Sequence, residues 1–259
     1  MGLLARLKSD AKRWRTALIL LLVAAIAIAF HSVWAIGALL TIIFAVASWE
    51  AIALFGYRGN LRLWCASAVA WLAAIFYPRP IEVVALAILV LAAIVALDQK
   101  RDLKVALPIL YPTAPMLFLF SLYTDFGIGA YIWLLAITLS CDAGAYYAGK
   151  ALGKTPFSPS SPNKTIEGVA GGITAAAIFG TIAGVIAPFS IGFWTILAIT
   201  IACAIASVFG DLFESYLKRK AQVKDSGSIL PGHGGALDRI DGYLFAAPVL
   251  LFALRLVAD

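Results

Sequence analysis

Residues 215–241, SYLKRKAQVKDSGSILPGHGGALDRID, concentrate the groups of this chain that could do chemistry. They include five basic residues, three aspartates and one of the two histidines. Four glycines fall between Asp225 and Gly235, and glycines allow backbone N–H groups to approach an anion closely. Asp238 and Asp241 follow on one face of a helix and suit Mg²⁺, which leaves room for substrate phosphates. The stretch therefore predicts a phosphate-rich substrate.

A polar helical face leads into this stretch. From Asp211, a helix places the side chains at i+3, i+4, i+7 and i+8 on one side. That side would carry carboxylates at the depth of the lipid and cations above them, from Asp211, Glu214, Ser215, Lys218 and Arg219. Lys220 lies off this face, and we expect it to serve membrane topology. The plainer interpretation is a helix end whose cations reach the membrane surface and pair with nearby carboxylates.

Asp142 is a second charged residue within an apolar segment, SCDAGAYYAGK. Placing a charged side chain at membrane depth costs free energy, so each such residue is a candidate functional residue. Tyr146 lies one helical turn further along the same face.

Residues 150–166 form a second polar segment, rich in proline and serine, that ends near SPNKTIEG. Thr165 is placed to cap the following helix, with Glu167 in its first turn. Lys164 would project beside that helix start, where it could serve topology or bind a phosphate.

The composition determines the class of protein. Hydrophobic residues make up 63% of the 259 residues, charged residues only 13%, and the mean hydropathy is +0.95. A soluble domain is roughly half apolar and about one quarter charged. No long polar insert divides the chain, so we expect a single membrane domain over residues 1–259. Its N-terminal spans would cover about residues 14–97, and the catalytic spans and loops about residues 104–259.

A membrane span needs about 20 apolar residues and must satisfy its own backbone groups, so we expect an all-α polytopic bundle. Nine spans are predicted, near residues 14–31, 33–54, 61–77, 81–97, 104–123, 128–149, 167–187, 191–213 and 241–258. The third and fourth are short and could form a re-entrant pair.

The basic residues orient these spans. With the N-terminus inside, every lysine and arginine except Arg79 and Arg255 falls on the cytoplasmic side. The N-terminus and the polar segments 150–166 and 215–241 are therefore predicted to be cytoplasmic. The net charge of +6 reflects this topology, with some attraction to anionic lipid headgroups, and needs no nucleic-acid partner.

Small residues recur at every fourth position of the seventh span: Gly168, Gly172, Ala176, Gly180 and Gly184. This spacing predicts a groove into which another helix packs closely.

The polar segments together contain the pattern S-x-x-K-R-x4-K-D-x-[small]-x2-[apolar]-P-x-H-G-G-x-x-D-R-x-D. This pattern resembles the signature of one family, the phosphatidate cytidylyltransferases or CDP-diacylglycerol synthases. Its fixed positions are Ser215, Lys218, Arg219, Lys224, Asp225, Gly227, Leu230, Pro231, His233, Gly234, Gly235, Asp238, Arg239 and Asp241. The similarity extends to DAGAYYAGK and SPNKTIEG, from about Lys104 to the end. Ile166 departs from it, because the family usually has tryptophan there.

The resemblance implies transfer of the cytidylyl group of CTP to phosphatidate, giving CDP-diacylglycerol and pyrophosphate, with Mg²⁺ and room for a second cation. The expected partners are CTP, phosphatidate and membrane lipids, and a homodimer is left open. The expected location is a bacterial inner membrane with the active site on the cytoplasmic face.

Each candidate residue has a predicted role. The metal ligands would be Asp211, Asp238 and Asp241, supported by Asp142. The catalytic group would comprise Lys218, Arg219, Lys224, Asp225, His233 and Arg239. Substrate would also contact Ser215, Lys164, Gly234 and Gly235. His233 could act as a general base, but we favour a hydrogen-bond donor to phosphate, because the lipid phosphate is already ionised.

Three other functions compete with this one. The run DRIDG imitates the start of the CDP-alcohol phosphatidyltransferase motif, but Phe245 and Ala246 stand where that motif has alanine and arginine. A prenol kinase that uses CTP would share the nucleotide and the location. A transporter could relay ions through Asp142 and Glu50, although transporters often show internal repeats and this chain has none that we detect.

Overall fold

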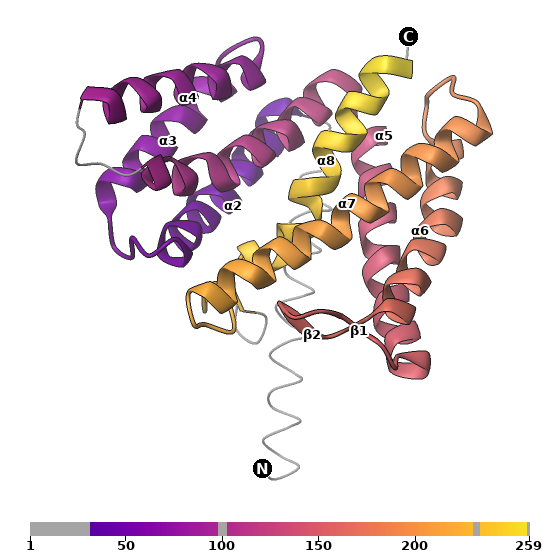
Figure 1. The fold of residues 1–259 in the computed structure, drawn as a ribbon. Coiled ribbons are helices and arrows are strands. Elements are labelled where there is room, and N and C mark those ends of the chain that lie inside the picture. Colours follow the sequence, from indigo (N-terminus) through magenta and orange to yellow (C-terminus); the bar gives the residue numbers. More distant parts are fainter. Residues whose placement is uncertain (1–31, 98–102, 230–233, 258–259) are drawn as a thin grey trace, which may run out of the picture. The chain divides into compact units, whose positions relative to one another are not determined.

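The computed structural model describes residues 32–97, 103–229 and 234–257. The elements in chain order are α2 (Val33–Leu54), α3 (Leu61–Ile75), α4 (Pro80–Leu97), the 3₁₀ turn η1 (Leu103–Ala106), α5 (Leu107–Leu152), β1 (Pro156–Ser158), β2 (Ser161–Thr165), α6 (Ile166–Ile186), α7 (Phe193–Lys220) and α8 (Leu237–Val257) (Figure 1). The first expected span, residues 14–31, lies outside the described residues.

Five of these helical segments are long and apolar enough to cross a membrane: Val33–Leu54, Lys104–Leu152, Ile166–Ile186, Phe193–Lys220 and Leu237–Val257. The chain is therefore an integral membrane protein built from helices, as the composition predicts. The pair α3 and α4 offers shorter apolar stretches, Leu61–Ile75 and Pro80–Val90. The count of nine spans stays a prediction.

The fifth and sixth expected spans join in α5, which is 46 residues long. A straight helix of that length would extend about 69 Å, more than twice the hydrocarbon thickness. It is not straight, because Gly127 has φ +68° and the Tyr131 hydroxyl donates to the Leu119 carbonyl at 2.8 Å. Twelve positions along a straight helix would separate these residues by about 18 Å. α5 therefore turns at Gly127 and consists of two arms, as Figure 1 shows.

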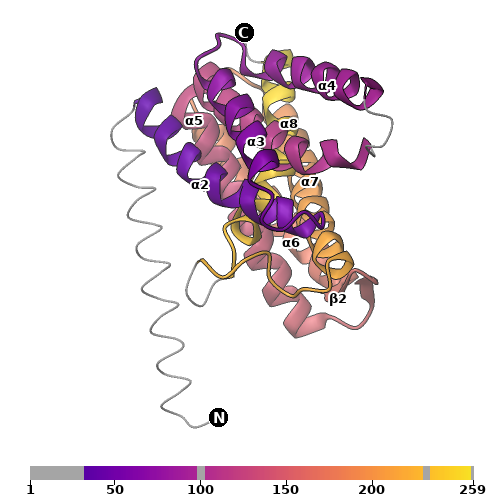
Figure 2. The same ribbon diagram turned by 90° about the vertical axis from the view of Figure 1, so that its left-hand side faces the viewer.

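The chain groups into two compact units. Residues 1–114 and 221–239 form the first, and residues 115–220 and 240–259 form the second. In the first unit α3 packs against both α2 and α4 (Figure 2). Phe44 of α2 stacks on Trp71 of α3 with ring centroids 4.6 Å apart, and the Trp71 indole donates to Thr41 at 3.0 Å. The expectation of a single membrane domain stays a prediction.

In the second unit, α6 packs against the second arm of α5 and against α7 through the predicted stripe of small residues. All five members of the stripe are buried. A Cβ atom added to Gly172 would lie 2.7 Å from the Cys141 carbonyl oxygen, and one added to Gly184 would lie 2.6 Å from Trp133. The helices are therefore as close as glycine permits, and the predicted packing groove is confirmed.

A short hairpin interrupts the helical fold. β1 and β2 pair antiparallel, with Pro156 opposite Thr165 and Ser158 opposite Ser161. The sequence predicted an all-α protein with a loop rich in proline and serine here, and it did not predict these strands. Both strands are edge strands, where proline is tolerated. The hairpin leads directly into α6, so it fixes the position of Lys164.

Candidate active site

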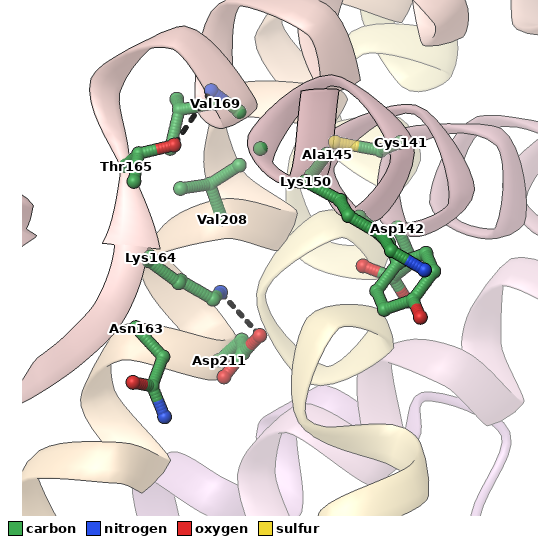
Figure 3. A pocket seen from close by; sticks show the side chains of 13 residues that line it. Cys141, Asp142, Ala145, Lys150, Asn163, Lys164, Thr165, Val169, Val208 and Asp211 are labelled. Atoms are coloured by element: carbon green, nitrogen blue, oxygen red, sulfur yellow. Dashed lines mark hydrogen bonds and ion pairs between the residues drawn. The ribbon is translucent and has the colours of Figure 1, made fainter. Parts of the chain in front are cut away.

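A cavity of about 450 Å³ opens in the second unit, among the second arm of α5, β2, α6 and α7 (Figure 3). Two carboxylates and two ammonium groups line it, from Asp142, Lys150, Lys164 and Asp211. The rest of the wall comes from Cys141, Ala145, Tyr146, Gly149, Asn163, Thr165, Gly168, Val169 and Val208. The structure thus brings together three of the candidate site residues, and Tyr146 shares this wall with Asp142 as predicted.

Lys164 and Asp211 form an ion pair at this cavity (Figure 3). Their side chains are 27% and 31% exposed, so solvent and ligands reach both. The Ser215 hydroxyl, one turn beyond Asp211 on α7, donates to the Asp211 carboxylate at 3.4 Å. An incoming phosphate could therefore compete with Asp211 for Lys164, and a cation could compete with Lys164 for Asp211.

The start of α6 holds Lys164 in place. The Gly168 N–H donates to the Thr165 hydroxyl at 3.1 Å, which confirms the predicted helix cap. Glu167, which was predicted only to lie near the positive end of the helix dipole, also accepts hydrogen bonds from the start of the hairpin. Its carboxylate accepts the N–H groups of Lys154 and Thr155 at 3.1 and 3.2 Å, and the Thr155 hydroxyl at 2.9 Å. Glu167 therefore fastens the beginning of the hairpin to its end.

Lys150 extends the cationic side of the cavity from the last turn of α5. Its ammonium lies 6.0 Å from the centre of the Tyr146 ring, within range of a cation–π contact. The sequence prediction treated this lysine only as a mark of topology. Its position at the end of the DAGAYYAGK segment was the signal that could have found it.

The polar face of α7 forms as predicted. Lys218 lies 3.6 Å from the buried carboxylate of Glu214, four residues earlier. Asp241, in the first turns of α8, lies beside Glu214, and the charges of Asp211 and Lys218 both act on it. Arg219 is exposed near the end of the helix. This face of α7 therefore carries two neighbouring carboxylates, Asp211 and Glu214. It also contains the ion pair between Lys218 and Glu214, which the simpler structural interpretation of the sequence predicted.

The glycine-rich loop belongs to the first unit and is organised by a carboxylate. Asp238 Oδ2 accepts the N–H and the hydroxyl of Ser226, both at 3.0 Å, and the Gly235 N–H at 2.8 Å. Gly234 has φ +82°, a conformation that other residues rarely adopt. Lys224 and Asp225 are exposed, as is Arg239. In this structure the Gly235 N–H therefore donates to a carboxylate. His233, a predicted site residue, lies outside the described part of the chain.

Glu50 of α2 contacts this loop, and the sequence prediction missed that contact. It is 3% exposed in α2, and its carboxylate accepts the Ser226 hydroxyl at 3.1 Å. The same carboxylate accepts the N–H groups of Ala236 and Leu237 at 3.2 and 2.9 Å. The sequence suggested only an ion relay for Glu50. A carboxylate within an apolar span was a signal that it had partners.

The predicted metal ligands fall into both units. Asp142, Asp211 and Asp241 lie in the second unit, and Asp238 lies in the first. Across residues 32–97, 103–229 and 234–257, no three carboxylate, thiol or imidazole side chains meet closely enough to hold a metal ion. The magnesium site stays a prediction.

Comparison with known proteins places this chain in a family. The sequence model of the cytidylyltransferase family matches residues 11–257. The chain belongs to this family. A phosphatidate cytidylyltransferase of Helicobacter pylori is 42% identical over 238 residues, which cover 92% of this chain and 89% of the relative. One of Thermotoga maritima is 36% identical over 69% of this chain and 70% of its own length. One of Bacillus subtilis is 47% identical over 51% of this chain and 49% of its own.

The family match includes every residue that lines the cavity and every residue of the glycine-rich loop. It also includes α2 with Glu50, which precedes the region that the sequence motifs identified. The similarity to the Helicobacter pylori relative likewise extends over most of the chain, including much of its N-terminal half.

Proposed function

We propose that this chain transfers the cytidylyl group of CTP to phosphatidate, giving CDP-diacylglycerol and pyrophosphate. Membership of the cytidylyltransferase family carries the proposal, together with the name shared by its relatives. The cavity supports it, because cations and carboxylates meet there beside apolar helices. Such a site serves a lipid that stays in the bilayer and a nucleotide that arrives from water.

In this reaction an oxygen of the phosphatidate phosphate attacks the α-phosphorus of CTP, and the bond to the pyrophosphate oxygen breaks. Both reactants are anions, so positioning and charge neutralisation provide most of the catalysis. Lys164 binds a phosphate at the cavity once Asp211 releases it. Lys218, Arg219, Lys224 and Arg239 neutralise the triphosphate and the lipid phosphate, and Ser215 orients Asp211. We assign His233, Gly234 and Asp225 to the loop around the phosphates.

In the second unit, Mg²⁺ would be held by Asp211 and Asp241, with Asp142 in support, and Asp238 is proposed as a ligand from the sequence alone. The donor set fits, because carboxylate oxygens are the ligands that Mg²⁺ prefers. Asp211 and Glu214 act electrostatically on Asp241, although in the described part of the chain no three carboxylates meet closely enough to hold a metal ion. When bound, the metal would neutralise charge on the phosphates. A second cation is compatible with the number of carboxylates.

We place the site at the cytoplasmic face of a bacterial inner membrane. The asymmetry of lysine and arginine supports this orientation, and it supports nine spans with the N-terminus inside. A homodimer stays a prediction of the sequence.

The deciding experiment follows two labels of CTP into lipid. Purified protein in detergent micelles is incubated with Mg²⁺, with either phosphatidate or a prenol as the acceptor, and with CTP labelled at either the α- or the γ-phosphate. Cytidylyl transfer carries only the α-label into the lipid phase and releases pyrophosphate. Transfer of the γ-label to a prenol acceptor would instead establish a lipid kinase. Absence of both transfers in protein that remains folded would contradict the proposal and favour a transporter.

A further inference from the structure

Glu50 and Asp238 together close the glycine-rich loop into a ring. Glu50 reaches the loop from α2, 176 positions before Ser226 and 187 before Leu237. The Ser226 hydroxyl lies 3.1 Å from Glu50 Oε2 and 3.0 Å from Asp238 Oδ2, so one side chain at the beginning of the loop meets both carboxylates. The backbone N–H groups of residues 235–237 complete the ring from its other end.

The loop is shaped to the Glu50 side chain. A Cβ atom added to Gly227 would lie 2.1 Å from Glu50 Oε1, and its three nearest atoms all belong to Glu50. A Cβ atom added to Gly235 would lie 2.5 Å from Glu50 Oε2. Two glycines of the loop are therefore positions where the buried carboxylate leaves no room for a side chain. Phosphate binding alone does not explain them.

The bonds of Glu50 extend to both ends of the loop. A carboxylate in an apolar span is costly unless it is paired. The described acceptor contacts of Glu50 all go to Ser226, Ala236 and Leu237. Lys224 precedes the first of these residues and Arg239 follows the last, and both are exposed. Glu50 therefore ties together the two ends of the loop, and Lys224 and Arg239 lie two residues outside the positions that it contacts.

We propose that Glu50 is a positioning residue for nucleotide binding, which holds Lys224 and Arg239 at the spacing that the triphosphate of CTP requires. This role rests on the proposed function, because it assigns the triphosphate to these cations. Glu50 does not touch the nucleotide. It acts through the loop, from a helix far from the glycine-rich motif in the sequence.

The first test separates positioning from general stability. In Glu50→Gln the side chain keeps its size but presents an amide N–H₂ toward backbone N–H groups, so the ring loosens. We expect the KM for CTP to rise about tenfold, as the loss of charge-assisted hydrogen bonds implies, while kcat changes less. A merely structural role would reduce the active fraction, lowering kcat at constant KM. The matched control is Glu82→Gln, since Glu82 is an exposed carboxylate in the first turn of α4 and should leave both constants unchanged.

The second test does not depend on activity. The rate of trypsin cleavage after Lys224, measured in detergent by mass spectrometry, should rise about tenfold in Glu50→Gln because the loop is held less firmly. The rate of cleavage after Lys154 serves as the internal reference. Ser226→Ala removes the hydroxyl that both carboxylates share and leaves the charge within α2 intact. It should accelerate the same cleavage even if Glu50→Gln fails to fold.

The third test uses the space between Glu50 and Gly227. Gly227→Ala alone should raise the KM for CTP and accelerate cleavage after Lys224, because its Cβ displaces the carboxylate. In a Glu50→Ala background that space is vacant, so the added methyl group should have little further effect. Full additivity of the two substitutions would overturn the proposed packing.

The outcomes also distinguish this inference from the proposed function. If the wild-type protein transfers no cytidylyl group but Glu50→Gln still exposes Lys224 to trypsin, the proposed function fails and the loop contact remains. An unchanged KM for CTP together with unchanged cleavage after Lys224, in folded Glu50→Gln, would overturn the positioning role while leaving the activity intact.

Discussion

Lys164 and Asp211 illustrate how single residues make this site. Each has an ordinary structural explanation in the sequence, as a basic loop residue and as a carboxylate near a helix end. In the structure they meet at one cavity, and each is only partly buried. Because solvent still reaches both groups at the cavity, each of them can exchange its partner for a ligand.

We expect Lys164→Ala to lower kcat/KM by about 10- to 100-fold, because a charge-assisted hydrogen bond to a phosphate would be lost. The control is Lys154→Ala, which removes a lysine from the same polar segment but does not line the cavity. Steady-state kinetics with varied CTP and phosphatidate would measure both variants. Equal kcat/KM values for the two variants would exclude Lys164 from phosphate binding.

Asp211→Asn keeps the size of the side chain and removes its charge, so it tests the predicted magnesium site. We expect the Mg²⁺ concentration for half-maximal activity to rise at least tenfold, with partial recovery at high Mg²⁺. Chelation should abolish wild-type activity, and added Mg²⁺ should restore it. If Asp211→Asn and Asp238→Asn both retained normal turnover and normal Mg²⁺ dependence, the assignment of the metal ligands would be wrong.

At the scale of elements, α6 and the second arm of α5 form the wall on which the cavity depends. Gly168 and Gly172 allow the two helices to touch along their backbones, because an added Cβ would meet the carbonyl oxygens of Ala145 and Cys141 at 2.9 and 2.7 Å. Asp142 and Lys150 are carried by one of these helices, and Lys164 immediately precedes the other. A small separation of the helices would therefore change the spacing of the charged groups.

Gly172→Val should lower the free energy of unfolding by about 1–3 kcal/mol, because the branched side chain forces the helices apart. The control is Thr174→Ala, an exposed position of the same helix, which should stay within about 0.5 kcal/mol of the wild type. Thermal unfolding in detergent, followed by circular dichroism, compares the two. A Gly172→Val midpoint equal to that of the wild type would contradict close packing of α5 and α6.

At the scale of the whole molecule, the distribution of lysine and arginine along the chain predicts which segments face the cytoplasm, and the fold alone does not test this prediction. With nine spans and the N-terminus inside, the hairpin and the glycine-rich loop both face the cytoplasm. This assignment requires the two arms of α5 to count as separate spans. The turn at Gly127, with φ +68°, agrees with that requirement.

Cysteine labelling in cells would test this topology. Single cysteines at Ser160 and Ser228, in a background where exposed Cys65 is replaced by alanine, should react with an impermeant thiol reagent only after the inner face is opened. Ser228 is suitable because it is exposed, whereas the nearby Ser226 is buried and bonded to Glu50. Labelling of either position in intact cells would contradict a cytoplasmic site.

The sequence by itself determined the features that depend on local pattern. Composition identified a membrane protein, and runs of apolar residues located α2, α3, α4, α6 and α8 to within a few residues, while α7 extends seven residues beyond its expected end and two expected spans join in α5. Small residues at every fourth position of α6 predicted its buried stripe, and the position of Thr165 before the helix predicted its N-terminal cap. The spacing of Asp211, Ser215 and Lys218 predicted one polar face of α7. These features follow from helical geometry and from transfer free energies, which act within a few residues.

Only the tertiary structure decided which distant groups meet. Periodicity states which side of a helix a residue occupies, but it does not name the partner on that side. The contact of Glu50 with a loop more than 170 positions away therefore could not be predicted, nor could the pairing of Lys164 with Asp211. The glycines of the loop suggested a phosphate nest, yet the Gly235 N–H binds Asp238. A backbone N–H group bonds the acceptor that the fold brings nearest, and that choice depends on packing.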